Sequence, residues 1–218
     1  MTKNILIVTT NFSDINDDIK TGVYLEEFAV PYLIFEATGY NITVASPNGG
    51  VSPIDEGSLS CSNPMEWDEA AKYLKDTKKL RDIDCKLYDV IFLPGGHGPM
   101  FDLAKDKVLK EIIEYMYKNN KIISAICHGP AGLILAKDDN GFSILKDKNV
   151  TSFTNKEEHI VKMDEFMPFL LETKLKELGA NFIEEKPWSE HVEICGNIIT
   201  GQNQKSATLI AESIISKL

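Results

Sequence analysis

The sequence predicts an α/β fold in which a mainly parallel sheet is flanked by helices on both faces. Short apolar runs alternate with segments whose apolar residues recur at helical spacing. The apolar runs are nearly continuous, which is typical of strands that are covered on both faces. With 218 residues, of which 43% are hydrophobic, the chain can bury a core of this kind without a disulfide or metal. We therefore expect a single domain over residues 1–218.

The elements are expected in the following order. Strands are predicted at residues 5–9, 42–45, 90–93, 122–126 and 150–153, and helices at 23–37, 67–74, 108–117, 130–136, 163–178 and 206–215. The pair Gly196 and Asn197 separates two further apolar runs, 192–195 and 198–200, and favours a small antiparallel hairpin at a sheet edge. Residues 51–88 are long for a connection between strands, so we expect a lid-like or partner-surface insertion there.

Composition argues against several classes of partner. The chain has 23 Lys and Arg against 33 Asp and Glu, so its formal net charge is 23 − 33 = −10. Such a balance repels nucleic acid and anionic lipid, and no apolar run is long enough for a signal sequence or a membrane span. The four cysteines are scattered, with no zinc-like spacing: Cys61, Cys85, Cys127 and Cys195. We expect reduced thiols and a cytoplasmic protein with no nucleic-acid or membrane partner.

Ligands of open α/β sheets bind beyond the carboxyl ends of the strands, and one such position carries a cysteine. Cys127 directly follows the apolar run 122–126 and precedes a predicted helix, with the small residues Ala125 and Gly129 on either side. This arrangement is typical of a nucleophile elbow. The neighbouring His128 favours a nucleophile over an ordinary core cysteine. A helix N-terminus at this point predicts a thiol pKa below the value of about 8.5 for a free cysteine.

A second strand end carries a glycine pair. Gly95 and Gly96 follow the run 90–93, where backbone N–H groups can approach a developing oxyanion. The next residue, His97, is compatible with a pocket position or with a solvent-facing turn. Trp188, which follows Pro187, is expected to pack rather than bind.

Four motifs occur in order along the chain: 21–27 (TGVYLEE), 93–100 (LPGGHGPM), 125–131 (AICHGPA) and 199–203 (ITGQN). Together they resemble the ThiJ/PfpI superfamily, and more narrowly its heat-shock chaperone and glyoxalase III subgroup. The resemblance covers nearly the whole chain. It implies a flavodoxin-like sheet of the class I glutamine amidotransferase type.

The resemblance also assigns roles to residues. It implies that Cys127 is the nucleophile, His128 its neighbouring base and Glu27 the carboxyl group beside the thiol, with Glu26 as the alternative if the register shifts by one. The third triad member is an acid after residues 150–153; an ungapped count selects Glu158, with Glu157 in reserve. Gly95, Gly96 and His97 are the candidates for binding the substrate and its oxyanion.

The activity implied is that of a lyase, a glutathione-independent glyoxalase that converts methylglyoxal, a small 2-oxoaldehyde, to lactate without metal or cofactor. A homodimer is implied as well. Repair of early glycation adducts uses the same residues. Two further alternatives remain open: a cysteine peptidase or amidase, and a redox-responsive chaperone that holds unfolded client proteins.

The sequence departs from the family pattern at two points. Val30 precedes Pro31 where many relatives have a histidine, so a role for that histidine is absent here. The order Glu190-His191 is not the His-x-Glu pair of a glutamine amidotransferase, which disfavours ammonia transfer from glutamine.

Overall fold

The computed structural model describes residues 2–60 and 62–218, so the prediction for Cys61 lies outside the described residues. Its main sheet contains the strands β1 (Asn4–Val8), β2 (Asn41–Ser46), β3 (Lys78–Lys79), β4 (Val90–Leu93), β5 (Ile122–Ile126), β8 (Val192–Cys195) and β9 (Ile198–Gly201). Their order across the sheet is β3-β2-β1-β4-β5-β9-β8. All neighbours are parallel except β8 and β9, which form the expected hairpin at one edge.

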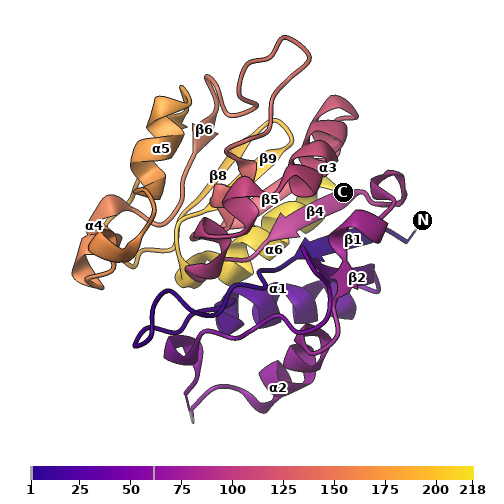
Figure 1. Ribbon diagram of the computed structural model, residues 1–218. Coiled ribbons are helices and arrows are strands. Elements are labelled where there is room, and N and C mark those ends of the chain that lie inside the picture. The colour runs from indigo at the N-terminus through magenta and orange to yellow at the C-terminus, as the bar shows by residue number, and fades with distance from the viewer. Residues whose placement is uncertain (1, 61) are drawn as a thin grey trace.

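Helices cover both faces of this sheet (Figure 1). The helices are α1 (Leu25–Ala37), α2 (Met65–Ala71), α3 (Lys107–Lys118), α4 (Asn155–Ile160), α5 (Leu171–Glu177) and α6 (Ala207–Lys217). On β1, Ile5 and Ile7 pack in the core cluster that contains α1 and α6, whereas Leu6 and Val8 pack in the cluster that contains α3. Successive strand residues point to opposite faces, so each strand is apolar throughout because both faces are buried.

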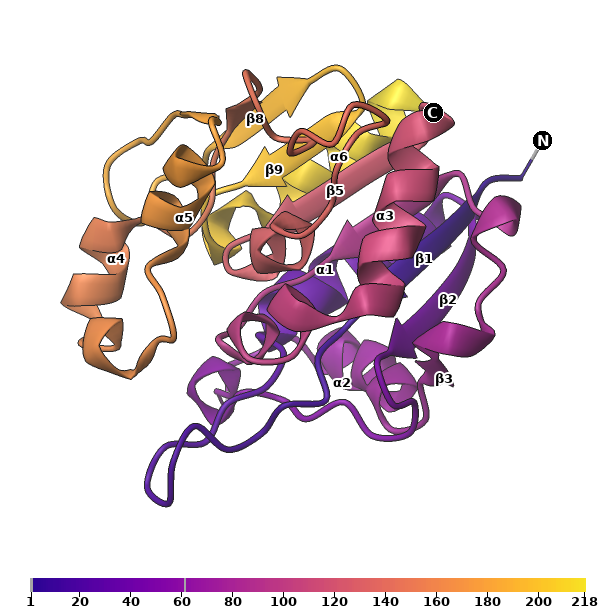
Figure 2. The same cartoon turned by 45° about the horizontal axis from the view of Figure 1, so that its top comes forward.

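The segment between β5 and β8 forms a smaller layer at the hairpin edge. There, β6 (Asn149–Val150) and β7 (Asn181–Phe182) make a two-stranded parallel sheet. Strand β6 contacts β8 and β9, and α4 and α5 lie at the same end of the main sheet, as Figures 1 and 2 both show. This layer brings residues 150–160 to the carboxyl end of β5.

The predicted fold class, with its parallel sheet and terminal hairpin, is confirmed, but one strand and two helices were predicted wrongly. The strand predicted at 150–153 is only the two-residue β6, which lies outside the main sheet. Residues 130–136 do not form an α-helix; a 3₁₀ helix spans Gly129–Leu133. The long helix predicted at 163–178 is divided into a 3₁₀ helix, Asp164–Phe166, and α5. Pro168 explains the division, because proline disfavours helical backbone in the preceding residue, and Met167 is extended with ψ of 141°.

The connection 51–88 packs against the start of α1 and contributes β3 to the sheet edge. The Ser58 hydroxyl accepts the Leu25 N–H at 3.0 Å, and so satisfies a backbone donor in the first turn of α1. Tyr24, at the N-cap, has no side-chain cap of its own. None of the helices in the described chain combines the length and apolarity needed to cross a membrane.

Candidate active site

Cys127 lies at the carboxyl end of β5 in a strained backbone conformation. Its φ is 59°, in the left-handed region that side chains other than glycine seldom adopt. Its N–H donates to Gly201 O at 2.9 Å, and its carbonyl accepts the Phe153 N–H at 2.9 Å. Hydrogen bonds to two neighbouring segments therefore hold the sharp turn after the strand, as a nucleophile elbow requires.

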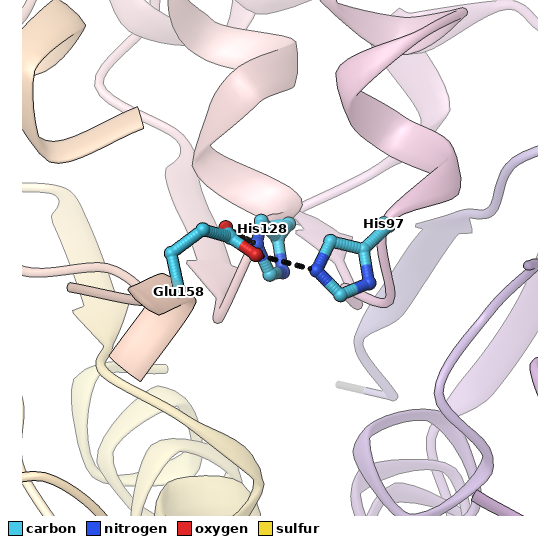
Figure 3. A group of neighbouring side chains, drawn as sticks. All are labelled: His97, His128 and Glu158. Atoms are coloured by element: carbon cyan, nitrogen blue, oxygen red, sulfur yellow. Dashed lines mark hydrogen bonds and ion pairs between the residues drawn. The ribbon is translucent and has the colours of Figure 1, made fainter. Parts of the chain in front are cut away.

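The carboxylate of Glu158, on α4, contacts two neighbouring imidazole rings (Figure 3). His128 Nε2 is 2.7 Å from Glu158 Oε2, and His97 Nε2 is 2.7 Å from Glu158 Oε1. On the other side of the His128 ring, Nδ1 is 3.3 Å from Cys127 Sγ. Cys127, His128 and Glu158 thus form a continuous line of hydrogen bonds, and His97 joins it through Glu158.

The protonation states of this line follow from its hydrogen bonds. Burial opposes ionisation of Glu158, but the His128 ring and hydrogen bonds from both histidines hold its pKa well below the ordinary value. An ionised carboxylate only accepts, so each Nε2 carries the proton that it donates. Burial lowers the pKa of His128, which keeps its ring neutral at neutral pH. His128 Nδ1 therefore offers a lone pair to the Cys127 thiol, which is the geometry of a general base.

The adjacent Glu157, the reserve candidate for the triad, points away from Cys127. Its Oε2 accepts the Thr154 N–H and hydroxyl, each at 2.9 Å, in a capping box that starts α4. Its Oε1 accepts the Trp188 N–H at 2.9 Å, Asn203 Nδ2 at 2.8 Å and Gln202 Nε2 at 3.2 Å. This buried carboxylate ties α4 to the segment before β8 and to the end of β9.

We expect Glu157→Gln to destabilise the fold by roughly 3 kcal/mol, because an amide places its own donors against buried donors. Urea denaturation measures the loss. The matched control is Glu184→Gln, which removes only an ion pair with Lys156 that is largely solvated, and should change the free energy of unfolding by less than about 1 kcal/mol. Equal losses in the two variants would show that the hydrogen bonds of Glu157 do not stabilise the fold more than a solvated ion pair does.

Glu27, in the first turn of α1, is fully buried beside Cys127. Its Oε2 accepts the Gly95 N–H at 2.9 Å, while Oε1 has no hydrogen-bond partner among the described atoms. The Cys127 thiol lies within hydrogen-bonding reach of the carboxyl group. A Cβ at Gly95 would lie 2.7 Å from Glu27 Oε2, so the glycine makes room for the carboxyl group. Burial raises the pKa of Glu27 from 4.5 to about 8. Glu26, the alternative, is only half-buried and lies outside the cavity.

Because the pKa of Glu27 is raised in the folded state, stability falls with pH between about 4.5 and 8, where only the unfolded chain loses this proton. Glu27→Gln removes that titration. We expect the variant to gain up to roughly 3–5 kcal/mol over the wild type as pH rises from 4.5 to 8. Thermal unfolding of both proteins across this range measures the difference, and a constant difference would contradict the raised pKa.

Gly96 and His97 line the same cavity as the elbow residues Cys127 and His128. Gly96 has φ of 89°, and a Cβ there would lie 2.2 Å from Gly22 O, so glycine is required. The Gly96 N–H faces the Cys127 sulfur. The His128 N–H donates to no acceptor in the described chain, which leaves two amides near the nucleophile. His97 lines the cavity, with its Nε2 held by Glu158.

The low thiol pKa expected for Cys127 was wrong for this resting site. Burial and the neighbouring Glu27 carboxylate raise the pKa of Cys127, and the Gly96 N–H, which favours the thiolate, does not offset them. The expected helix N-terminus is only a 3₁₀ helix, Gly129–Leu133, which supplies little dipole. The thiol is therefore protonated at rest, and its activation depends on His128.

A cavity of about 270 Å³ opens over the thiol. Five of its lining residues were named from the sequence: Glu27, Gly96, His97, Cys127 and His128. Gly95, which was also named, does not line it, and its N–H donates to Glu27 instead. Trp188 was expected only to pack, and other lining residues were not predicted, among them Tyr24, Asp55, Phe153 and Val161.

His97, His128 and Glu158 also have the donor set of a metal site, with one ligand atom from each within 4.8 Å of the others. In this arrangement, however, both Glu158 oxygens already accept imidazole N–H groups. A cation at this point would have to replace both hydrogen bonds and the tautomer that prepares His128 Nδ1. The three residues therefore suit proton transfer through hydrogen bonds better than they suit a metal centre.

The chain is similar in sequence and structure to several known proteins. The chain is 33% identical to the glutathione-independent glyoxalase hsp3102 of Schizosaccharomyces pombe, over 99% of this chain and 98% of that protein. Its structure matches glyoxalase III of Candida albicans with a TM-score of 0.91 at 31% identity, covering 98% and 96% of the two chains. It also matches Rapid Encystment Protein 24 KDa of Francisella tularensis with a TM-score of 0.94 at 38% identity, covering 99% and 98%. The model of the DJ-1/PfpI family matches residues 19–217, and the chain therefore belongs to that family.

Proposed function

We propose that this protein is a glutathione-independent glyoxalase that converts methylglyoxal to lactate. The observation that carries the proposal is the buried Glu27 carboxyl group beside the buried Cys127 thiol. Hydrolysis of an amide needs a nucleophile, a base and an oxyanion site, whereas isomerisation also needs a group that moves a proton between adjacent carbons. Relatives that carry the name glutathione-independent glyoxalase support the same activity.

The first step forms a bond between Cys127 Sγ and the aldehyde carbon. His128 Nδ1, 3.3 Å from the sulfur, takes the thiol proton as the bond forms. Negative charge that develops on the aldehyde oxygen is stabilised by the backbone N–H groups of Gly96 and His128. His128 then returns the proton to this oxygen, which gives a neutral thiohemiacetal.

The second step is an internal oxidation and reduction. The Glu27 carboxylate removes the proton from the former aldehyde carbon and returns it to the ketone carbon, while the hydroxyl proton passes from the first oxygen to the second. The aldehyde carbon is oxidised to a thioester and the ketone carbon is reduced to an alcohol. No electrons leave the substrate, so no external oxidant is consumed.

The third step releases the product. His128 Nδ1 takes a proton from water, the hydroxide adds to the thioester carbon, and the bond to Cys127 Sγ breaks. The sulfur recovers its proton from His128. Glu158 and His97 do not react in this scheme; Glu158 holds the His128 ring and its tautomer. One methylglyoxal and one water give one lactic acid.

The direct test is lactate formation from methylglyoxal by the purified protein without glutathione. The expected result is one lactate for each methylglyoxal consumed, with the same rate when a chelator is added. A folded protein that forms no lactate would overturn the proposal. Cleavage of peptide or amide substrates by that same preparation would then favour the peptidase or amidase alternative.

We further propose a homodimer, on the strength of the family and of exposed apolar side chains in the 51–88 connection. Met65 is 85% exposed and Leu59 is 52% exposed, which suits a partner surface, while Asp55 and Gly57 of the same connection line the cavity as a lid would. Light scattering at micromolar concentration is expected to give twice the chain mass of 24.4 kDa. A monomer under these conditions would contradict the dimer.

A role in holding unfolded client proteins is a separate proposal, which rests on the family resemblance. If it is correct, Cys127→Ala should still suppress aggregation of a denatured client. Holding that disappears with the thiol would instead favour the redox-responsive alternative.

A further inference from the structure

Trp188 adopts a backbone conformation that is unusual for a large side chain. Its φ is 64°, in the left-handed region where a bulky residue is an outlier. Two hydrogen bonds hold it there: its N–H donates to the buried Glu157 carboxylate at 2.9 Å, and the next carbonyl, Ser189 O, accepts Asn203 Nδ2 at 3.0 Å. Strain of this kind persists only where the surroundings over-determine it, and it is concentrated at functional sites.

The strained backbone places the Trp188 ring at the cavity over Cys127. Its centroid is 5.6 Å from that of Phe153, and the Phe153 centroid is 4.6 Å from that of His128. Val161, just after α4, lines the same cavity and is 38% exposed. An apolar wall therefore runs from the reacting imidazole to the mouth of the cavity.

The charged groups of the cavity are acidic. Glu27 and Asp55 line it, and no Lys or Arg of the described chain does so. A substrate with a carboxylate would meet these two acids, of which Glu27 is ionised only as pH approaches 8, without a compensating cation. The cavity, at about 270 Å³, also has more room than methylglyoxal fills.

We propose that Trp188, Phe153 and Val161 form a subsite for the substituent R of a 2-oxoaldehyde R–CO–CHO, and that an uncharged aryl or bulky apolar R is preferred over methyl. The inference rests on the proposed glyoxalase function and specifies its substrate class. The chemistry is unchanged: the thiol adds to the aldehyde carbon, one proton moves to the ketone carbon, and one water releases a 2-hydroxy acid. The R group takes no part in bond making and stacks against the aromatic wall.

Phenylglyoxal and methylglyoxal are the probes, with mandelate and lactate as the measured products. We expect kcat/KM of the wild type to be about tenfold higher for phenylglyoxal, as one stacked aromatic pair would give. Trp188→Asn keeps a residue that tolerates left-handed backbone and removes the ring. It should lower the ratio of the two kcat/KM values by about tenfold, and Trp188→Phe should restore most of it.

Two controls separate this effect from others. Phe142→Ala removes an exposed aromatic ring that does not line the cavity, and should leave both kcat/KM values unchanged. Phenylglyoxal also modifies arginine, so the assay is repeated with Arg81→Lys, which removes the sole arginine of the sequence.

Phenylglyoxal that carries a ring carboxylate should be a poorer substrate than phenylglyoxal itself.

The outcomes distinguish the subsite from the function on which it rests. Wild type that forms lactate but shows no preference for phenylglyoxal would overturn the subsite alone. An unchanged ratio in folded Trp188→Asn, checked by circular dichroism, would do the same, as would a Trp188→Phe variant that fails to restore it. A wild type that forms neither lactate nor mandelate would overturn the glyoxalase function.

Discussion

Cys127→Ala is expected to abolish lactate formation from methylglyoxal while the fold stays intact. The sulfur is the only atom in the proposed scheme that bonds to substrate, and loss of a nucleophile from a comparable triad costs about 10⁴-fold or more in rate. Alanine removes one buried sulfur atom from an otherwise apolar cluster, so thermal unfolding should change little. Lactate formation and the unfolding temperature are measured on the same preparation.

The matched control for this variant is Cys195→Ala, which removes a thiol on the edge strand β8 that does not line the cavity. It should retain wild-type activity. Lactate formation by Cys127→Ala at more than a trace of the wild-type rate would show that the thiol is not the nucleophile. The remaining candidates would then be the noncovalent chaperone role or chemistry at another group.

Glu27→Gln is expected to lower turnover by about 10²- to 10⁴-fold, the usual loss when a positioned proton-transfer group is removed. The amide is nearly isosteric and can still accept the Gly95 N–H, so the fold is retained. Wild-type turnover should also rise with pH to about 8, because burial raises the pKa of Glu27 to about 8 and only its ionised form acts as a base. The pH profile and the variant rate come from one lactate assay.

Glu26→Gln is the control for register, since Glu26 is the neighbouring acid in the same helical turn and lies outside the cavity. It should retain activity. If Glu26→Gln loses turnover and Glu27→Gln keeps it, the register on α1 is wrong by one residue. If both keep turnover, the proton transfer through Glu27 does not occur, and the hydrolase or chaperone alternatives gain support.

Much of the fold was predictable because its signals are local. The continuous apolar runs of the central strands indicate burial on both faces, and Gly196-Asn197 indicates a hairpin. The structure contains these elements at nearly the expected positions. The helix at 163–178 was wrong because the apolar spacing outweighed Pro168 in that interpretation. The short helix α4 was missed, since its signal is only the capping box from Thr154 to Glu157.

In the candidate site, too, the residues with a local sequence signal were predictable and the others were not. Cys127 and His128 are adjacent in sequence at a strand end, so one pattern indicated both. Glu27 and Glu158 come from other elements, and only the family resemblance pointed to them before the structure placed Glu27 beside Cys127 and Glu158 against the His128 ring. The prediction of a low pKa for the Cys127 thiol was wrong because burial raises this pKa, and burial depends on the packing of the whole chain rather than on the local strand end. Trp188 was expected to pack, and its place in the cavity lining was not predicted, because its left-handed backbone is imposed by Glu157 and Asn203, which lie far from it in sequence.

In the proposed mechanism, substrate carbon passes through a thioester on Cys127. Acid quenching of the wild-type protein during turnover of methylglyoxal, followed by removal of small molecules and treatment with hydroxylamine, tests for this thioester. We expect hydroxylamine to release the hydroxamate of lactic acid, and peptide mass spectrometry to place the group on Cys127. Lactate formation at the full rate with no such group on Cys127, or with the group on another residue, would contradict this mechanism.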